Sequence, residues 1–252
     1  MVAKIRNITK QFQSTHQTRF KNLLVSGCSY TWNNSEQHIC SWPFYLRDIG
    51  GFDSVIDCSQ VGAGSNHIFN SVVNEIETNP DTNKHNTLVV VMWSGLTRTD
   101  VIATQDITAP WHDMSNYNFD QKFATLSIFN HTSNNDLLSM LCRQYKLLID
   151  TDAQIYESVL KILALEHYLK QKEFDFIFTS WMNPAPELHR IDSALTTKVI
   201  SSLSTIPYLE EYAKQKKQKE SDDGHPTPDG YLGWTQQHLI PYLESKNIIE
   251  IL

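Results

Sequence analysis

Four short apolar runs, each almost free of charged residues, constrain the fold of this chain more than any other feature of its sequence. They span residues 22–28, 54–58, 87–93 and 174–181. Strands that are buried on both faces of a parallel sheet give such continuous runs, whereas strands with one solvated face alternate apolar and polar residues. The four runs therefore predict buried parallel strands.

Segments with helical spacing lie between these runs and after them. Residues 65–76 and 152–171 carry apolar side chains at helical spacing, with Asp152 as the expected N-cap of the second segment. A last helix is expected to begin after Pro228 and Asp229. Strands that alternate with helices predict an α/β sandwich with right-handed crossovers, in which ligands bind at the carboxyl ends of the strands.

Length and composition favour one globular domain over residues 1–252. Residues 101–150 are rich in Asn, Asp, Thr and Ser and interrupt the alternation, so they are expected to form an insertion with a short helix near 134–148. The net charge of −7 disfavours binding of nucleic acid through a basic face. The one basic cluster, at 214–219, is followed by acidic residues and is expected to be a solvated helix end.

The sequence contains few motifs that indicate a cellular location or a cofactor. No signal peptide or membrane-spanning run is visible, so a cytoplasmic location without a membrane partner is expected. Cys28 and Cys58 lie in apolar contexts and are expected to be buried. The nearest candidates for a metal site are His38 with Cys40, and His112 with Asp113. Because these pairs lack the spacing of zinc motifs, neither a metal nor another cofactor is expected.

A serine follows the first apolar run, in the sequence Gly27-Cys28-Ser29. Such a serine can simply cap the following helix. At the end of a buried strand, however, Ser29 would lie at the rim of the sheet, and a helix that starts there would point free N–H groups toward the reacting atoms. Ser29 is therefore the candidate nucleophile, and its own N–H is a candidate donor to an oxyanion.

The segment Asp222-Asp223-Gly224-His225 near the other end of the chain offers a base for that serine. A carboxylate three residues before the histidine can fold back to its Nδ1–H and leave Nε2 facing Ser29. Asp222 has this spacing, and Asp223 is the alternative. An acidic turn that caps the final helix is the structural alternative for the whole segment. If the fold brings Ser29 and His225 together, the sequence predicts a hydrolase.

Two further clusters follow the second and third apolar runs. Gly62 and Gly64 allow the backbone to approach a ligand closely, although a tight strand-to-helix turn needs glycines as well. No Gly-Lys-Ser/Thr follows them, so this is not a phosphate-binding loop. Ser94, Thr97 and Arg98 form a candidate substrate rim, in which Arg98 could equally be half of a surface ion pair.

Taken together, these motifs resemble the SGNH hydrolases, also called the GDSL family of esterases and lipases. The first block of that family, Gly-Asp-Ser, resembles residues 27–29, with a cysteine in place of the aspartate. Its second block supplies an oxyanion glycine and is similar to residues 57–65, with Gly62 as the best match. Its fifth block, Asp-x-x-His, matches Asp222 and His225. The resemblance covers nearly the whole chain apart from the insertion.

The resemblance implies a flavodoxin-like three-layer α/β/α sandwich with a mainly parallel five-stranded sheet, whose fifth strand is expected at 204–209. The third block of the family carries an asparagine that donates to the oxyanion, and this sequence has none at 94–97. Ser94, Thr97 or Arg98 would have to replace it. A divergent subgroup with Gly-Cys-Ser-Tyr/Phe-Thr in the first block is more similar to this chain.

The resemblance also implies a serine esterase that hydrolyses O-acyl esters. Acetyl esters of a saccharide are the first choice of substrate, and Trp32 and Trp93 could form a platform for a sugar or equally be core residues. Two alternatives remain: an inactive protein of the same fold that binds a glycan or a protein partner, and an acyltransferase with the same triad. The sequence does not give the oligomeric state.

Overall fold

The computed structural model describes residues 4–5, 13–32, 41–102, 123–126, 144, 150–191, 194–216 and 225–252. In chain order its elements are β1 (Lys4–Ile5), β2 (His16–Thr18), β3 (Asn22–Gly27), α1 (Trp42–Gly50), β4 (Ser54–Asp57), α2 (Ser65–Thr78), β5 (Thr87–Trp93), β6 (Thr99–Ile102), β7 (Phe123–Leu126), α4 (Thr151–Gln171), β8 (Phe176–Ser180), α5 (Ala185–Leu188), α6 (Ala194–Leu203), α7 (Leu209–Gln215), α8 (Pro228–Trp234), the π-helix η2 (Thr235–Leu239), α9 (Ile240–Ser245) and β9 (Ile249–Ile251). None of the described helices is both long and apolar enough to cross a membrane.

The central sheet has five strands in the order β1-β4-β3-β5-β8. The four strands that the apolar runs predict are all parallel, and β1 pairs antiparallel with β4 at the edge. Counted along the chain, the parallel strands have the order 2-1-3-4, which is the order of the flavodoxin-like class up to its fourth strand. The predicted α/β fold with a mainly parallel five-stranded sheet is confirmed.

The position of the fifth strand was predicted wrongly. Residues 204–209 connect α6 to α7 and begin the latter helix, and the fifth strand of the sheet is β1. Ile206 is buried in the core, but Pro207, which has no N–H to donate to a sheet, follows it directly. An apolar connection between two helices was therefore mistaken for a strand.

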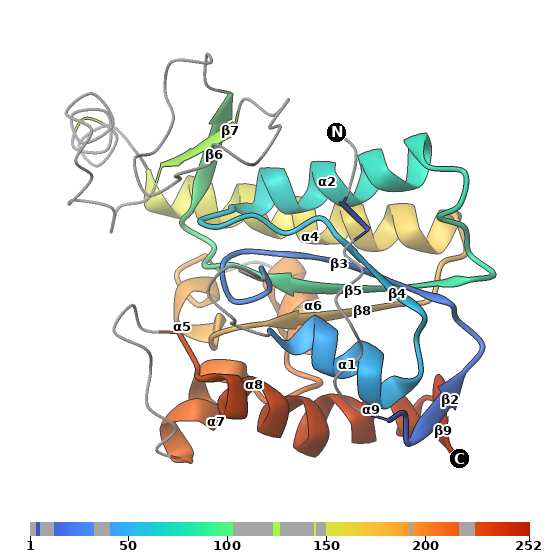
Figure 1. Ribbon diagram of the computed structural model, residues 1–252. Helices are drawn as coiled ribbons and strands as arrows, with labels where there is room; N and C mark the ends of the chain where they lie inside the picture. The colour runs from blue at the N-terminus through green and yellow to red at the C-terminus, as the bar shows by residue number, and fades with distance from the viewer. Residues whose placement is uncertain are drawn as a thin grey trace, which may run out of the picture.

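Helices cover both faces of the sheet (Figure 1). Helices α2 and α4 lie on one face, and α1, α8 and α9 lie on the other. We call these the α2 face and the α1 face. Successive strand residues point to opposite faces, so β5 contributes Val89 and Val91 to the core under α2, and Leu88, Val90 and Met92 to the core under α1.

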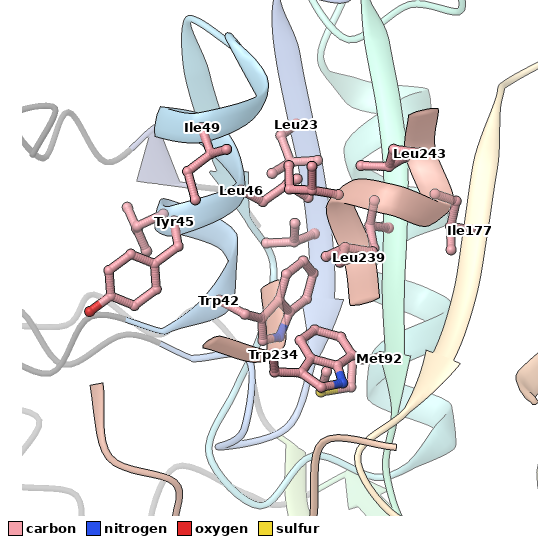
Figure 2. Close-up of a cluster of buried hydrophobic side chains, with 14 of the residues drawn as sticks. Leu23, Trp42, Tyr45, Leu46, Ile49, Met92, Ile177, Trp234, Leu239 and Leu243 are labelled. Atoms are coloured by element: carbon pink, nitrogen blue, oxygen red, sulfur yellow. The ribbon is translucent and has the colours of Figure 1, made fainter. Parts of the chain in front are cut away.

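The core on the α1 face anchors the C-terminal helices (Figure 2). Trp42 of α1 and Trp234 of α8 are both fully buried and meet edge to face, with ring centroids 6.3 Å apart. The Trp234 indole N–H also donates to the Pro207 carbonyl over 2.7 Å. Truncation of a buried aromatic side chain of this kind costs about 3–5 kcal/mol. Helix α8, which ends at Trp234, is therefore held firmly against the α1 face.

Side-chain caps set the start of two helices. The predicted last helix begins at Pro228, and the Thr227 hydroxyl accepts from the Gly230 N–H. For α4, however, the N-cap is Asp150, whose carboxylate accepts from the N–H groups of Asp152 and Ala153. The prediction of Asp152 as the cap was wrong, because that residue already lies in the first turn.

The insertion is described only in part. Strands β6 and β7 pair antiparallel at its base. Of the segment 134–148, where a helix was expected, only Gln144 is described, and it is helical. The basic cluster does begin at a helix end, since α7 ends at Gln215, and Lys214 and Lys216 are exposed. The rest of that cluster lies outside the described residues.

Candidate active site

Ser29 lies just beyond the carboxyl end of β3, next to the neighbouring strand β5. The chain leaves β3 through α1 to reach β4 on one side, and then passes through α2 to reach β5 on the other side. The gap between β3 and β5 is therefore the topological switch point, where ligands of open α/β sheets bind. Gly27 allows this turn, because a Cβ there would clash with Thr31 Oγ1 and lie 2.7 Å from the Met92 carbonyl.

His225 meets Ser29 at this edge of the sheet. Its Nε2 lies 2.7 Å from Ser29 Oγ, although the two residues are 196 positions apart in the sequence. His225 stands two residues before Thr227, the cap of α8, so the packing of that helix on the α1 face brings the imidazole to the serine. The structure therefore brings Ser29 and His225 together, as the sequence motifs predicted.

The backbone at Ser29 forms a turn. The N–H groups of Thr31 and Trp32 both donate to the Cys28 carbonyl, and no described helix starts at Ser29. Residues 33–40, where the expected helix after Ser29 would continue, lie outside the described part of the chain. The backbone N–H of Ser29 has no acceptor among the described residues and is available to a ligand.

Gly62 lies in a tight turn between β4 and α2. The Ala63 N–H donates to the Gln60 carbonyl over 3.0 Å, and Gly62 has a φ of 76°. This is the third position of a turn that favours glycine, because L side chains rarely adopt a positive φ. A Cβ on Gly62 would have no atom of the described residues within 4 Å, so nothing in the described part of the chain crowds this position. No described residue accepts from its N–H.

Backbone hydrogen bonds tie this loop to the strand that carries Ser29. The Cys58 N–H donates to the Val25 carbonyl over 2.8 Å, and the Gln60 N–H donates to the Gly27 carbonyl over 3.1 Å. These bonds continue the β3–β4 ladder beyond the last residue of β4. The separation between the Ser29 turn and Gly62 is thus set by the sheet itself.

Asp100 fixes the other end of the same loop. Its carboxylate, which is 7% exposed, accepts from the Gly64 N–H over 2.8 Å and from the His67 N–H over 2.7 Å. Two N–H groups at the start of α2 are thereby satisfied by a residue of β6. Sequence analysis missed Asp100, because a cap contributed by a distant strand leaves no local pattern.

Two buried titratable groups lie behind the loop. Burial lowers the pKa of His67, and the nearby Asp100 carboxylate offsets part of that effect. Burial also raises the pKa of the Cys58 thiol well above its ordinary value, and the negative charges of Glu75 and Asp57 add to this. Cys58 is therefore not a competing nucleophile. Cys28 is fully buried as well, so both cysteines occupy the predicted positions in the core.

The three candidate substrate residues after β5 have different environments. Ser94 is 2% exposed, and its hydroxyl has no partner among the described residues. Thr97 is 4% exposed, and its hydroxyl lies 3.5 Å from Glu187 Oε1, so it supports the turn. Arg98 is half-buried, and its Nη1 has no partner among the described residues.

This turn after β5 is braced by two helices that sequence analysis did not connect to the site. The Glu187 carboxylate of α5 accepts from the Leu96 N–H over 3.0 Å. The Ser158 hydroxyl of α4 donates to the Leu96 carbonyl over 2.7 Å. The turn that follows Ser94 is therefore held at Leu96 by hydrogen bonds from both helices.

Two aromatic residues beside the histidine were also missed. The ring of Tyr30 stacks on Trp181, which directly follows β8, and it contacts the imidazole of His225. The sequence did place Trp181 at the end of an apolar run, but only as part of a strand. Trp93, which was considered as a platform for a sugar, is fully buried against Phe178 and is not available to a ligand. Trp32 is half-buried.

Several predicted residues lie outside the described part of the chain. These are the candidate orienting carboxylates Asp222 and Asp223, and the metal candidates His38, Cys40, His112 and Asp113. Within the described residues, no group of three or more metal-ligating side chains is found.

Comparison with known proteins gives distant structural likenesses only. No family model and no curated protein matches the chain. The chain is similar to the crystal structure of TesA, with a TM-score of 0.46, 14% identity, and coverage of 89% of this chain and 98% of that one. It is similar to a GDSL-like lipase from Bacteroides thetaiotaomicron VPI-5482, with a TM-score of 0.38, 16% identity, and coverage of 90% and 89%. A putative acylhydrolase from Bacteroides fragilis NCTC 9343 has a TM-score of 0.38, 16% identity, and coverage of 90% and 88%. These likenesses are too distant to carry an argument, so function rests on the geometry of the site.

Proposed function

We propose that this chain is a serine esterase of the SGNH type, which hydrolyses O-acyl esters. The observation that carries the proposal is the 2.7 Å separation between Ser29 Oγ and His225 Nε2 at the switch point of the sheet. A nucleophile and a base within hydrogen-bond reach are the geometric requirement for acyl transfer. The sequence motifs around both residues, which resemble that family, support the same reading.

In the proposed reaction, Ser29 Oγ attacks the ester carbonyl while His225 Nε2 takes the hydroxyl proton. The imidazolium then returns this proton to the departing alcohol, which leaves an acyl group on Ser29. Water attacks the acyl group, His225 takes a proton from the water, and the acid leaves as Ser29 regains its proton. Asp222, or Asp223 in its place, holds the ring through Nδ1–H.

The negative oxygen that develops on the carbonyl needs hydrogen-bond donors. The N–H groups of Ser29 and Gly62 are proposed for this role, and both are free of acceptors among the described residues. Loss of one such donor costs about 10²–10³-fold in kcat in other acyl-transfer enzymes. Ser94 is the proposed third donor, because its hydroxyl is buried and unpartnered directly after β5, whereas that of Thr97 contacts Glu187.

The proposed substrate is a small molecule or saccharide that carries a short acyl ester, with an acetyl ester as the first to be tested. Arg98 remains a candidate for binding a polar group of this substrate. Because Trp93 is fully buried, a sugar platform would have to come from other residues.

Fluorophosphonate labelling tests the proposal directly. The wild-type protein is expected to be modified at Ser29 in a one-to-one ratio, and Ser29→Ala and His225→Ala are expected to lose both labelling and hydrolysis of p-nitrophenyl acetate. Asp222→Asn and Asp223→Asn, made separately, identify the orienting carboxylate by the larger loss of kcat. Absence of labelling in the folded wild-type protein would contradict the esterase and favour a binding protein of the same fold.

A further inference from the structure

Tyr30 directly follows the proposed nucleophile, and its ring contacts two other rings. Its centroid lies 4.2 Å from that of Trp181, with an interplanar angle of 14°, and 4.5 Å from that of His225, with an angle of 39°. Tyr30 follows β3 and Trp181 follows β8, and both of these strands pair with β5. The three rings therefore form one connected cluster at the carboxyl edge of the sheet, in which Tyr30 stacks on Trp181 and makes a tilted contact with His225.

The hydrogen bond from Ser29 to Nε2 does not by itself fix the imidazole. It sets the position of one nitrogen, and the proposed contact of Nδ1–H with Asp222 or Asp223 orients the other. The ring of Tyr30 adds a further restraint on the plane of the imidazole, and tilted aromatic pairs at such distances are favourable. Tyr30 in turn is held by Trp181 and by both hydrophobic cores, against which the two rings pack.

The same contact is suited to the cation that His225 becomes during the reaction. During acyl transfer the imidazole becomes a cation, and the face of an aromatic ring attracts a cation within about 6 Å. A neutral imidazole gains less from this contact. The ring of Tyr30 is therefore placed to stabilise the transition state more than the resting state.

We propose that Tyr30 is a positioning residue for His225: its ring restrains the plane of the imidazole and stabilises the imidazolium form, and Trp181 holds Tyr30 in place. The inference rests on the proposed function, because it takes His225 to be the base. It concerns the ring of Tyr30 and makes no use of the phenolic hydroxyl.

The decisive comparison is between Tyr30→Phe, which keeps the aromatic face, and Tyr30→Leu, which removes it. Tyr30→Phe is expected to behave as the wild type. Tyr30→Leu is expected to lower kcat about three- to tenfold, and to move the acid limb of the kcat/KM profile to lower pH by about 0.4–0.7 units. The direction follows because loss of the ring disfavours protonated His225. Trp181→Leu is expected to shift the limb in the same direction by less.

Apart from the phenol of Tyr30, the titratable groups around the imidazole are the same in all these variants. The described ones are the Ser29 hydroxyl and the Tyr30 phenol, and Asp222 and Asp223 are the proposed carboxylates. Since only the phenol differs between wild type and Tyr30→Phe, that pair isolates its contribution. A shift found in Tyr30→Leu but not in Tyr30→Phe therefore reports the ring.

Tyr212 provides a matched control, because it also contacts a histidine. Its ring meets that of His238 edge to face, with centroids 5.2 Å apart. Tyr212→Leu is expected to lower stability, because Tyr212 is 4% exposed, yet to leave the acid limb in place. An equal shift in this control, or no difference between Tyr30→Leu and Tyr30→Phe, would overturn the proposal.

A readout without catalysis separates this proposal from the proposed function. Titration of the His225 ring proton by NMR, assigned with His225→Gln, is expected to show a lower midpoint in Tyr30→Leu than in Tyr30→Phe. If the wild type neither reacts with the fluorophosphonate nor hydrolyses esters, the esterase fails while this midpoint still tests the role of Tyr30. Equal midpoints in the two variants would refute that role even in an active enzyme.

Discussion

The two halves of the candidate site are held in different ways. The half that offers N–H groups, at Ser29 and Gly62, is fixed by backbone hydrogen bonds to β3 and by the carboxylate of Asp100. The half that provides the base is held by side-chain contacts, because His225 contacts the Ser29 hydroxyl and the ring of Tyr30. Backbone geometry tolerates most substitutions except at glycines and caps, whereas a site built from side chains depends on each partner.

Loss of Asp100 tests the first half most severely. Asp100→Ala leaves the N–H groups of Gly64 and His67 without their acceptors, in a buried place. We expect a loss of about 2 kcal/mol in unfolding free energy. Because the loop that carries Gly62 would keep its backbone bonds to β3 but lose its anchor at Gly64, we also expect kcat to fall on the order of 10²-fold. Urea denaturation and ester hydrolysis measure the two effects.

Asp150→Ala is the matched control for this prediction. Asp150 also caps a helix with its carboxylate, at the start of α4, but it is exposed, and the bonds described for it are those of the cap. Its loss is expected to lower stability by about 1 kcal/mol and to leave kcat unchanged. If both variants lose stability but neither loses activity, Asp100 is a helix cap without influence on the site.

A smaller effect is expected from Gly62→Ala. The added Cβ would meet no atom of the described residues within 4 Å, so the expected cost comes from the φ of 76°, about 1 kcal/mol. We expect a loss of about tenfold in kcat, because the turn relaxes and its N–H tilts away from the oxyanion. Unchanged KM with reduced kcat would be the signature of a donor that acts in the transition state.

Gly51→Ala separates the conformational cost from the effect on the site. Gly51 ends α1 with a φ of 82°, and a Cβ there would lie 2.5 Å from the His16 carbonyl. This variant is expected to lose more stability than Gly62→Ala but to keep its kcat. A parallel fall of kcat in both variants would mean that activity simply follows stability.

The contrast between the two halves also explains what could be predicted from the sequence. Continuous apolar runs and strand-end residues such as Ser29 and Gly62 are local signals, so the parallel strands, the fold and these positions were found. The convergence of His225 on Ser29 was predicted from motifs alone and agrees with the structure. The proposed catalytic roles of these residues remain predictions.

Interactions between side chains from distant elements left no such signal. Asp100 caps a helix from a strand, Tyr30 stacks on a residue of another strand end, and Glu187 braces the turn after β5 from a short helix. None of these pairs has a fixed spacing in the chain. The fifth strand was missed for a related reason, because β1 has only two residues and shows no pattern.

The smallest expected effect is a change in the pH dependence of stability. Burial holds the pKa of His67 below its ordinary value, so between that lowered pKa and about 6.5 the unfolded chain binds more protons than the folded one. Unfolding free energy should therefore fall as the pH drops below about 6.5, by at most about 1.4 kcal/mol per pH unit from this residue.

His67→Gln removes the titration while keeping an N–H donor for the Cys58 carbonyl, which lies 3.2 Å from Nε2 in the wild type. Urea midpoints at pH 7, 6 and 5 should then fall less steeply for His67→Gln than for the wild type. His67 lies beside Asp100 at the start of α2. If the urea midpoints of both proteins fall equally steeply with pH, protonation of His67 does not destabilise the half of the site that carries Ser29 and Gly62.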